Sequence, residues 1–410
     1  MLFQIEDLTI FVLLMGGIII LSILIRYLFR RAGVPSLVGF LILGFLIRLA
    51  NLPLAFLTEP IKDIFEFLGT IGIIFLLFRV GLESNITGLL RQLKRATIIW
   101  FGNVVFSGAT AYVTSYFLLG LAVIPSLFVA FALTATSVAV SVGTWEEARA
   151  INSPMGELLV DSAEMDDVSG VILMALLFAV APVMQGNTEV NLTNVAFKTL
   201  GLFLAKLIGF GAFCYLFSRY LERPMTRFFK RLEPSLCCPL LVIIGVTLAV
   251  AAMAGLLGFS VAIGAFFAGL LFSRDPEAVK EEAHLSILYE LFTPFFFINV
   301  GLSVDPNTLT AAIWLGLILL VAAIVGKVAG NSLPALVSNR WTDALLLGVS
   351  MIPRAEIAMV IMHQGLLLGD WAVPTSVYSG MVFVSLITLV ISPIVIRFML
   401  KRWPPTIYDT

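Results

Sequence analysis

The chain has 410 residues, of which 60% are hydrophobic and only 12% are Asp, Glu, Lys or Arg. A soluble protein carries about twice that share of charged residues, so this composition excludes a soluble globular domain. The formal net charge of −1 indicates little about partners, and we expect no nucleic-acid partner. Apolar runs of about 20 residues recur from one end to the other, and each can cross a bilayer. The sequence therefore predicts an all-α polytopic membrane protein embedded in lipid.

Proline, glycine and clusters of charge divide these runs into about 13 predicted transmembrane helices. In chain order we expect them at residues 8–29, 35–50, 63–82, 96–119, 124–143, 156–183, 195–218, 236–254, 258–273, 283–302, 310–335, 342–364 and 374–398. Eighteen of the 25 lysines and arginines fall in one alternating set of loops, and three fall in the opposite set. By the positive-inside rule the N-terminus lies outside and the C-terminus in the cytoplasm. A bacterial inner membrane is the expected location.

A short internal repeat suggests how the helices are related. The segments "FRVGLESN" (78–85) and "INVGLSVD" (298–305) share V-G-L and close predicted helices 3 and 10. These helices are seven apart, an odd number, so the two copies run in opposite directions across the membrane. The simplest interpretation is two inverted six-helix repeats joined by helix 7. Such repeats place the substrate site near the bilayer midplane, where broken helices from each half cross.

Two helix interruptions fall at corresponding places in the repeats. In predicted helix 5 the segment "LTATSVAVS" (133–141) is rich in hydroxyl groups. In predicted helix 12 the segment "SMIPRAEIA" (350–358) has Pro353 in mid-span. Proline removes an amide donor and clashes with the preceding turn, so it can break a helix. Unwound backbone at this depth must be buried in protein or line a wet cavity. A simple proline kink with packed hydroxyl groups is the alternative.

Six charged side chains lie near the middle of predicted membrane spans, where each costs at least ~2.5 kcal/mol. They are Glu164, Asp166, Asp167, Lys327, Arg354 and Glu356. Four carboxylates against two cations leave at least one carboxylate without a protein cation. That carboxylate must bind a proton, a cation, or each in turn.

Adjacent carboxylates in a medium of low dielectric repel each other and titrate as a pair, so one of them takes up a proton readily. Carboxylates, hydroxyl groups and freed carbonyls are also hard ligands that suit Na⁺ or another alkali cation. A proton and a cation would compete for the same oxygens. Competition becomes exchange if only the loaded states cross the membrane. Lys327 could neutralise Asp166 when the site is empty.

The sequence resembles bacterial Na⁺/H⁺ antiporters of the monovalent cation:proton antiporter-2 family over essentially its whole length. The resemblance depends on the order and spacing of "GVPSLVGFLILG", "TATS", the adjacent "DD", "GLLGFSVAIGAFFAGLLFSR", "FFFINVGLSVD", "GK" and "MIPRAEIAMV". It implies that Asp167 is the main ion-binding carboxylate and that Asp166 is the partner of Lys327. Na⁺ would bind at these two aspartates.

The same resemblance implies that Thr134 and Thr136 lie at the first helix crossover and Glu356 at the second. Glu164 departs from the family pattern, which is apolar at that position. It lies three residues before Asp167 and shares its helix face. It could favour protonation of Asp167, add a ligand, or pair with Arg354.

The resemblance further implies a homodimer with an elevator-like moving core, electrogenic exchange, and a role in pH homeostasis. Residues 1–95 and 233–305 would form the dimer scaffold, 96–190 and 306–410 the ion-binding core, and 191–232 the linker. No cofactor is expected beyond the transported Na⁺ and H⁺.

Other functions stay open to different degrees. An intramembrane aspartyl protease needs two facing aspartates, but neighbours on one helix diverge by roughly 100°, so we do not expect an enzyme. A Na⁺-coupled solute symporter shares the architecture but does not require so many buried carboxylates. Within antiport, K⁺/H⁺ exchange is the nearest alternative to exchange of Na⁺ or Li⁺.

Overall fold

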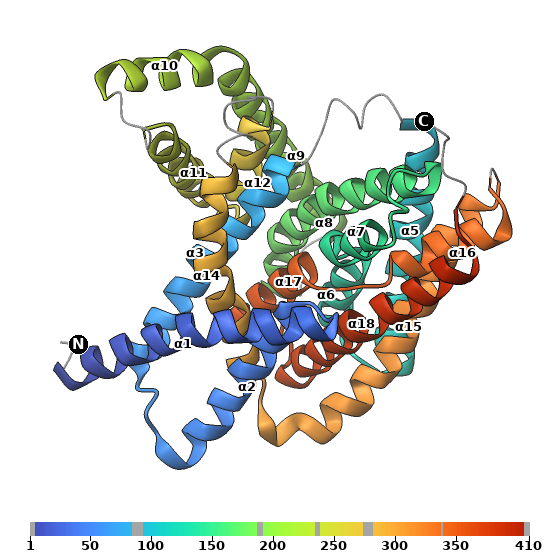
Figure 1. Ribbon diagram of the computed structural model, residues 1–410, viewed down its shortest axis with the longest axis horizontal. Coiled ribbons are helices and arrows are strands. Elements are labelled where there is room, and N and C mark those ends of the chain that lie inside the picture. The colour runs from blue at the N-terminus through green and yellow to red at the C-terminus, as the bar shows by residue number, and fades with distance from the viewer. Residues whose placement is uncertain are drawn as a thin grey trace. The chain divides into compact units, whose positions relative to one another are not determined.

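The computed structural model describes residues 5–83, 93–186, 192–233, 238–273, 282–337 and 339–405, and every regular element within these ranges is a helix (Figure 1). The chain divides into two compact units. The first unit comprises Met1–Glu66, Thr87–Gly170 and Phe297–Thr410. The second unit comprises Phe67–Ile86 and Val171–Phe296. The prediction of an all-α fold is therefore confirmed for the described residues.

The first unit contains most of the long helices. They are α1 (Ile5–Ala32), α2 (Ser36–Leu54), α5 (Leu93–Val113), α6 (Val123–Thr134), α7 (Val138–Glu147), the first half of α8 (Pro154–Gly186), the end of α14 (Glu282–Leu302), α15 (Leu309–Ala335), α16 (Trp341–Ser350), α17 (Glu356–Leu368) and α18 (Thr375–Arg402). A π-helical turn at Thr114–Leu118 extends α5, and a 3₁₀ turn at Pro306–Thr308 precedes α15.

The second unit contains most of α3 (Glu59–Glu83), the second half of α8, α9 (Leu192–Leu216), a π-helical turn (Phe217–Leu221), α10 (Glu222–Leu232), α11 (Cys238–Leu256), α12 (Val261–Phe272) and most of α14. Helix α10 was not expected from the apolar runs, which leave residues 219–235 as a loop. Its sequence "ERPMTRFFKRL" alternates cations with apolar residues at helical spacing and has no long apolar run. Apolar runs in the sequence alone therefore do not predict it, although the candidate membrane span Gly201–Phe229 extends into it.

Nine helices in the described part of the chain are long and apolar enough to cross a membrane. Three shorter apolar helices accompany them, at Leu240–Leu256, Val261–Phe272 and Glu356–Leu368. The chain is thus a multi-pass membrane protein, while the count of 13 helices stays a prediction. The five-part division into scaffold, core and linker also stays a prediction.

Helix α15 buries one face within the first unit, including Lys327. It packs most extensively on α5 and α18 and also contacts α16 (Figure 1). Beside it, a cluster of buried side chains that includes Trp145, Leu159, Leu346 and Met351 joins α7, α8 and α16. This packing holds the middle of α15, and therefore Lys327, among side chains from several helices.

The glycines of the repeated V-G-L segments make equivalent contacts in the two units. A Cβ atom at Gly301 of α14 would overlap the Leu41 backbone of α2, next to Gly44. A Cβ atom at Gly81 of α3 would overlap the Phe266 backbone of α12, next to Gly269. Small residues allow such close approach of helix backbones. Each V-G-L glycine therefore packs on a glycine of the other half of the chain, as the predicted inverted repeat would require.

Candidate functional site

Both predicted helix interruptions are present, and they touch each other. Residues 135–137 separate α6 from α7, and residues 351–355 separate α16 from α17. The amide of Ser137 in the first break donates a hydrogen bond to the carbonyl of Pro353 in the second, at 2.8 Å. Each break leaves backbone groups without helical partners. Some of these groups now face the charged side chains of the site.

Asp166 of α8 lies beside the first break and is only 1% exposed. Its Oδ2 accepts hydrogen bonds from Lys327 Nζ at 2.8 Å and Thr136 Oγ1 at 2.6 Å. The amide nitrogen of Asn103 on α5 donates to both carboxylate oxygens, at 2.6 and 2.7 Å. A buried carboxylate needs a cation and several donors to offset its lost hydration. Asp166 has both.

Lys327 of α15 is fully buried, with 0% exposure. Its ammonium donates to Asp166 Oδ2, to Thr136 Oγ1 at 2.7 Å and to the Thr134 carbonyl at 2.6 Å. An ammonium has three donors, and all three are used. The Thr134 hydroxyl instead donates to Phe131 in its own helix, at 2.7 Å. In this structure the contribution of Thr134 to the site is its backbone oxygen.

Asn103 was not identified from the sequence, although it is fully buried and contacts Asp166 directly. Its own Oδ1 accepts hydrogen bonds from Ser107 Oγ at 2.9 Å and Asn331 Nδ2 at 3.3 Å. These donors fix the amide so that its nitrogen faces the carboxylate. In the sequence, Asn103 and Asn331 each follow a glycine within an apolar helix, as "GN" at 102–103 and 330–331. A single amide in such a helix indicates a functional position less strongly than a charge does.

Arg354 lies in the second break and is fully buried. Its Nη1 donates to the carbonyl of Ala135 at 2.8 Å and to that of Met351 at 3.0 Å. Its Nε and Nη2 have no hydrogen-bond partner among the described residues. Arg354 therefore joins the two breaks by neutralising carbonyl oxygens that the broken helices release. Its sequence assignment as a charge partner did not anticipate this role.

The remaining predicted carboxylates are less buried than Asp166. Asp167, Glu164 and Glu356 are all partly exposed. Glu356 begins α17 and accepts a hydrogen bond from Ser137 Oγ at 2.9 Å, so it lies at the crossing of the two breaks. Asp167 follows Asp166 on α8, and Glu164 precedes it by one turn. The structure thus gathers one sealed carboxylate and one partly accessible neighbour.

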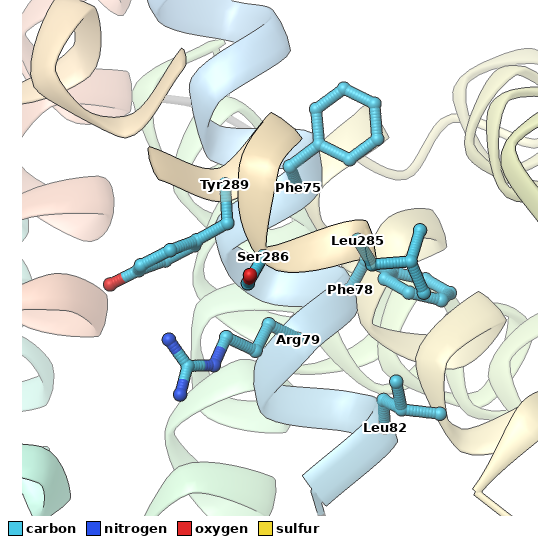
Figure 2. A pocket seen from close by; sticks show the side chains of 7 residues that line it. All are labelled: Phe75, Phe78, Arg79, Leu82, Leu285, Ser286 and Tyr289. Carbon is cyan, nitrogen blue, oxygen red and sulfur yellow. The ribbon is translucent and has the colours of Figure 1, made fainter. Parts of the chain in front are cut away.

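A separate small pocket lies in the second unit, between α3 and α14. It is lined by Phe75, Phe78, Arg79, Leu82, Leu285, Ser286 and Tyr289 (Figure 2). The guanidinium of Arg79 lies 4.7 Å from the centre of the Tyr289 ring, and its Nε pairs with Glu83 at 2.6 Å. None of the predicted site residues lines this pocket. We interpret it as a packing feature of the two helices.

A multi-pass helical protein with two touching helix breaks around buried charges has the architecture of a secondary transporter. The family model described as "Sodium/hydrogen exchanger, transmembrane" matches residues 18–402. The chain belongs to this family, whose members are cation/proton antiporters and not enzymes.

Relatives and a solved structure agree with this assignment. The chain is 28% identical over 377 residues to the "Na(+)/H(+) antiporter" of Enterococcus hirae, covering 91% of this chain and 94% of that one. It is also 28% identical to the "Na(+)/H(+)-K(+) antiporter GerN" of Bacillus cereus, covering 90% of each. The sodium proton antiporter MjNhaP1 of Methanocaldococcus jannaschii matches with a TM-score of 0.71 at 16% identity, covering 97% of this chain and 99% of that one. That structural match confirms the antiporter fold.

Proposed function

We propose that this protein exchanges Na⁺, and also Li⁺, for H⁺ across a membrane. The observation that carries the proposal is the buried Asp166–Lys327 ion pair beside two crossing helix breaks, with the partly exposed Asp167 next to it. An ion pair sealed from solvent holds the charge balance of the site, while an accessible carboxylate can take up and release ions. The family membership and the names of the relatives support the same reaction.

Asp167 is the carboxylate at which proton and cation compete in this proposal. The described residues contain no group of three or more His, Cys, Asp or Glu side chains placed to hold a metal ion. Hydroxyl and carbonyl oxygens would therefore complete a cation site, which suits a weakly bound alkali cation. Asp166 Oδ2 and Thr136 Oγ1 already accept hydrogen bonds from Lys327. They become cation ligands only after the ammonium moves away.

The side chains at the crossing would support this exchange in different ways. Glu356 and the Thr134 carbonyl supply oxygens close to the breaks. Glu164 adds negative charge one turn from Asp167. Arg354 keeps the two breaks together, so that movement of one is transmitted to the other. If Lys327 moves together with the proton and the cation, each cycle carries net charge and the exchange is electrogenic. The movement would be an elevator-like motion of the core in a homodimer.

The membrane setting is proposed in the same way. A bacterial inner membrane, with the N-terminus outside and the C-terminus in the cytoplasm, agrees with the distribution of lysine and arginine,. In that orientation α8 enters from the cytoplasm and reaches Asp166 about 18 Å along its axis,. This depth corresponds to the middle of a bilayer core that is about 30 Å thick.

K⁺/H⁺ exchange is a second candidate, because one relative of equal identity is named a Na⁺/H⁺-K⁺ antiporter. The same carboxylates and carbonyls could bind either cation. The difference would arise from the size of the cavity around Asp167 after Lys327 moves.

Proton flux in liposomes tests both candidates. The purified protein would be reconstituted with an inside-acid pH gradient and a fluorescent pH dye, and Na⁺, Li⁺ or K⁺ would be added in turn between pH 6 and 9. We expect Na⁺ and Li⁺ to dissipate the gradient and Asp167→Asn to abolish the response. Asp370→Asn is the matched control, because it makes the same chemical change at an exposed residue.

The outcomes separate the alternatives. A response to K⁺ alone would keep the mechanism and change the substrate. Equal activity of Asp167→Asn and Asp370→Asn would contradict the role of Asp167. Failure of every alkali cation at every pH would favour Na⁺-coupled solute symport. The same assay with an imposed membrane potential tests whether the exchange is electrogenic. The exchange rate changes with the potential only if each cycle carries net charge.

A further inference from the structure

Helix α10 has two opposite faces of different chemistry. At about 100° per residue, Met225, Phe228, Phe229 and Leu232 fall within one stripe of the helix,. The exposed arginines Arg223, Arg227 and Arg231 repeat every fourth residue and form the opposite stripe. Arg219, in the π-helical turn before α10, continues this series by one further step. A basic, strongly amphipathic helix of this kind is typical of a membrane interface.

Neither stripe is covered by the other described residues of the second unit. Phe228 is 58% exposed, Phe229 42% and Leu232 64%. The buried residues of α10 are instead Glu222 and Thr226, which lie between the stripes. Thr226 Oγ1 donates to Glu222 Oε1 at 3.2 Å, so this narrow edge is polar. Helix α10 therefore rests on its neighbours by one edge and leaves its apolar and basic faces uncovered.

The position of α10 along the chain places it beyond the hydrocarbon core. Helix α9 has 25 residues and is about 37 Å long, which already spans a core of about 30 Å,. The π-helical turn at Phe217–Leu221 follows α9, and Pro224 lies in the first turn of α10. Figure 1 shows α10 leading from the end of α9 toward α11 instead of continuing along the axis of α9. A helix that turns aside at the end of a membrane span lies at the level of the lipid headgroups.

We propose that α10 is an interfacial helix that binds anionic phospholipid. Its apolar stripe inserts at the boundary between headgroups and acyl chains, and its arginines bind lipid phosphates. Guanidinium groups suit this ligand because they donate paired hydrogen bonds to phosphate. A second copy of the chain fits the surface less well, because a copy that covers the apolar stripe leaves the arginines of the opposite stripe without an anion. The lipid would act on the end of α9, which connects the two predicted halves of the transporter.

Hydrogen exchange of α10 in the whole protein tests this proposal. The protein would be reconstituted in vesicles of phosphatidylcholine alone, or with a third of the lipid replaced by phosphatidylglycerol. Each cation near an anionic surface changes partitioning about fivefold. We expect the α10 amides to exchange at least ~10-fold more slowly in the anionic vesicles. Added salt should weaken this protection, because it screens exposed charges.

Four variants identify the cause of any protection. The α10 exchange rate should no longer differ between the two kinds of vesicle in the triple variant Arg223→Gln, Arg227→Gln and Arg231→Gln. Arginine-to-lysine changes at the same positions should retain most of that difference. Phe228→Ser with Phe229→Ser should give fast exchange in both vesicles. The matched control, Arg30→Gln with Arg31→Gln and Arg402→Gln, removes three exposed cations elsewhere and should retain the difference.

Two results would overturn the proposal. One is α10 exchange that does not depend on lipid charge. The other is protection that rises with the amount of protein per vesicle at constant lipid composition, which would assign the surface to a second copy of the chain. Exchange of α15 serves as the internal reference for folding, because an unfolded variant would lose protection there as well.

Discussion

Asp166 and Asp167 are neighbours on α8, yet their surroundings differ completely. Asp166 is 1% exposed and accepts hydrogen bonds from Lys327, Thr136 and Asn103. Asp167 is partly exposed and lies on a helix face that it shares with Glu164. The difference teaches that a pair of identical residues can divide two tasks. One carboxylate anchors the structure of the site, and we infer that its neighbour exchanges ions.

Removing Lys327 should have the largest effect on stability. Lys327→Met leaves the Asp166 carboxylate buried without a cation, which costs about 3–5 kcal/mol. Thermal unfolding in detergent measures this loss, and Asp167→Asn should change stability by less than about 1 kcal/mol. The double variant Asp166→Asn with Lys327→Met should recover part of the loss, because the two residues interact directly. Equal losses in Lys327→Met and Asp167→Asn would remove the distinction between the two aspartates.

Asn103→Leu should have the second largest effect. It removes two hydrogen bonds to a buried charge, and such bonds contribute about 1.5–3 kcal/mol. Ser107→Ala is the matched control, because it keeps the amide and removes only one donor that orients it. We expect Ser107→Ala to lose about 1 kcal/mol in the same unfolding measurement. A larger loss in Ser107→Ala than in Asn103→Leu would show that Asn103 does not stabilise Asp166.

Thr136→Val should cost less, about 1.5 kcal/mol, because it removes one donor to Asp166 and one acceptor of Lys327,. Thr134→Val makes the same chemical change two residues earlier. Among the described residues the Thr134 hydroxyl bonds only within α6, and the variant keeps the carbonyl contact with Lys327. Stability and Na⁺-dependent proton flux should therefore both fall further in Thr136→Val. The reverse order would mean that the hydroxyl of Thr134, and not that of Thr136, supports the site.

Glu164→Gln should have the smallest effect on stability, within about 0.5 kcal/mol, because Glu164 is partly exposed,. Its effect should appear in transport. Loss of a negative charge one turn from Asp167 weakens the attraction of a cation, so the apparent KM for Na⁺ should rise severalfold with little change in the maximal rate. An unchanged KM would separate Glu164 from the ion site.

The sequence located the helix breaks because their causes are local. Pro353 cannot complete a helical hydrogen bond, and the hydroxyl groups of "TATS" offer the backbone other partners. The charged residues in mid-membrane were also visible, because charge in an apolar run is costly and therefore rarely accidental. These local signals located the two regions that meet in the structure.

What the sequence did not predict depends on contacts between distant segments. Asn103 contacts Asp166 from another helix. A single amide in an apolar run does not indicate which residue it will contact. The use of the Thr134 carbonyl in place of its hydroxyl depends on how the broken end of α6 faces α15. The orientation of Arg354 toward two carbonyls depends in the same way on the crossing of the breaks.

The paired glycine contacts have a consequence for the order in which the chain assembles during synthesis. Gly44 of α2 packs on the α14 backbone near Gly301, which the ribosome adds roughly 250 residues later. At about 5–20 residues per second, α2 waits roughly 10–50 s in the bilayer before its partner arrives. Gly81 of α3 waits for α12 in the same manner. Neither half of the chain can complete its packing alone, so the two halves expressed as separate polypeptides should persist in the membrane only when both are made together.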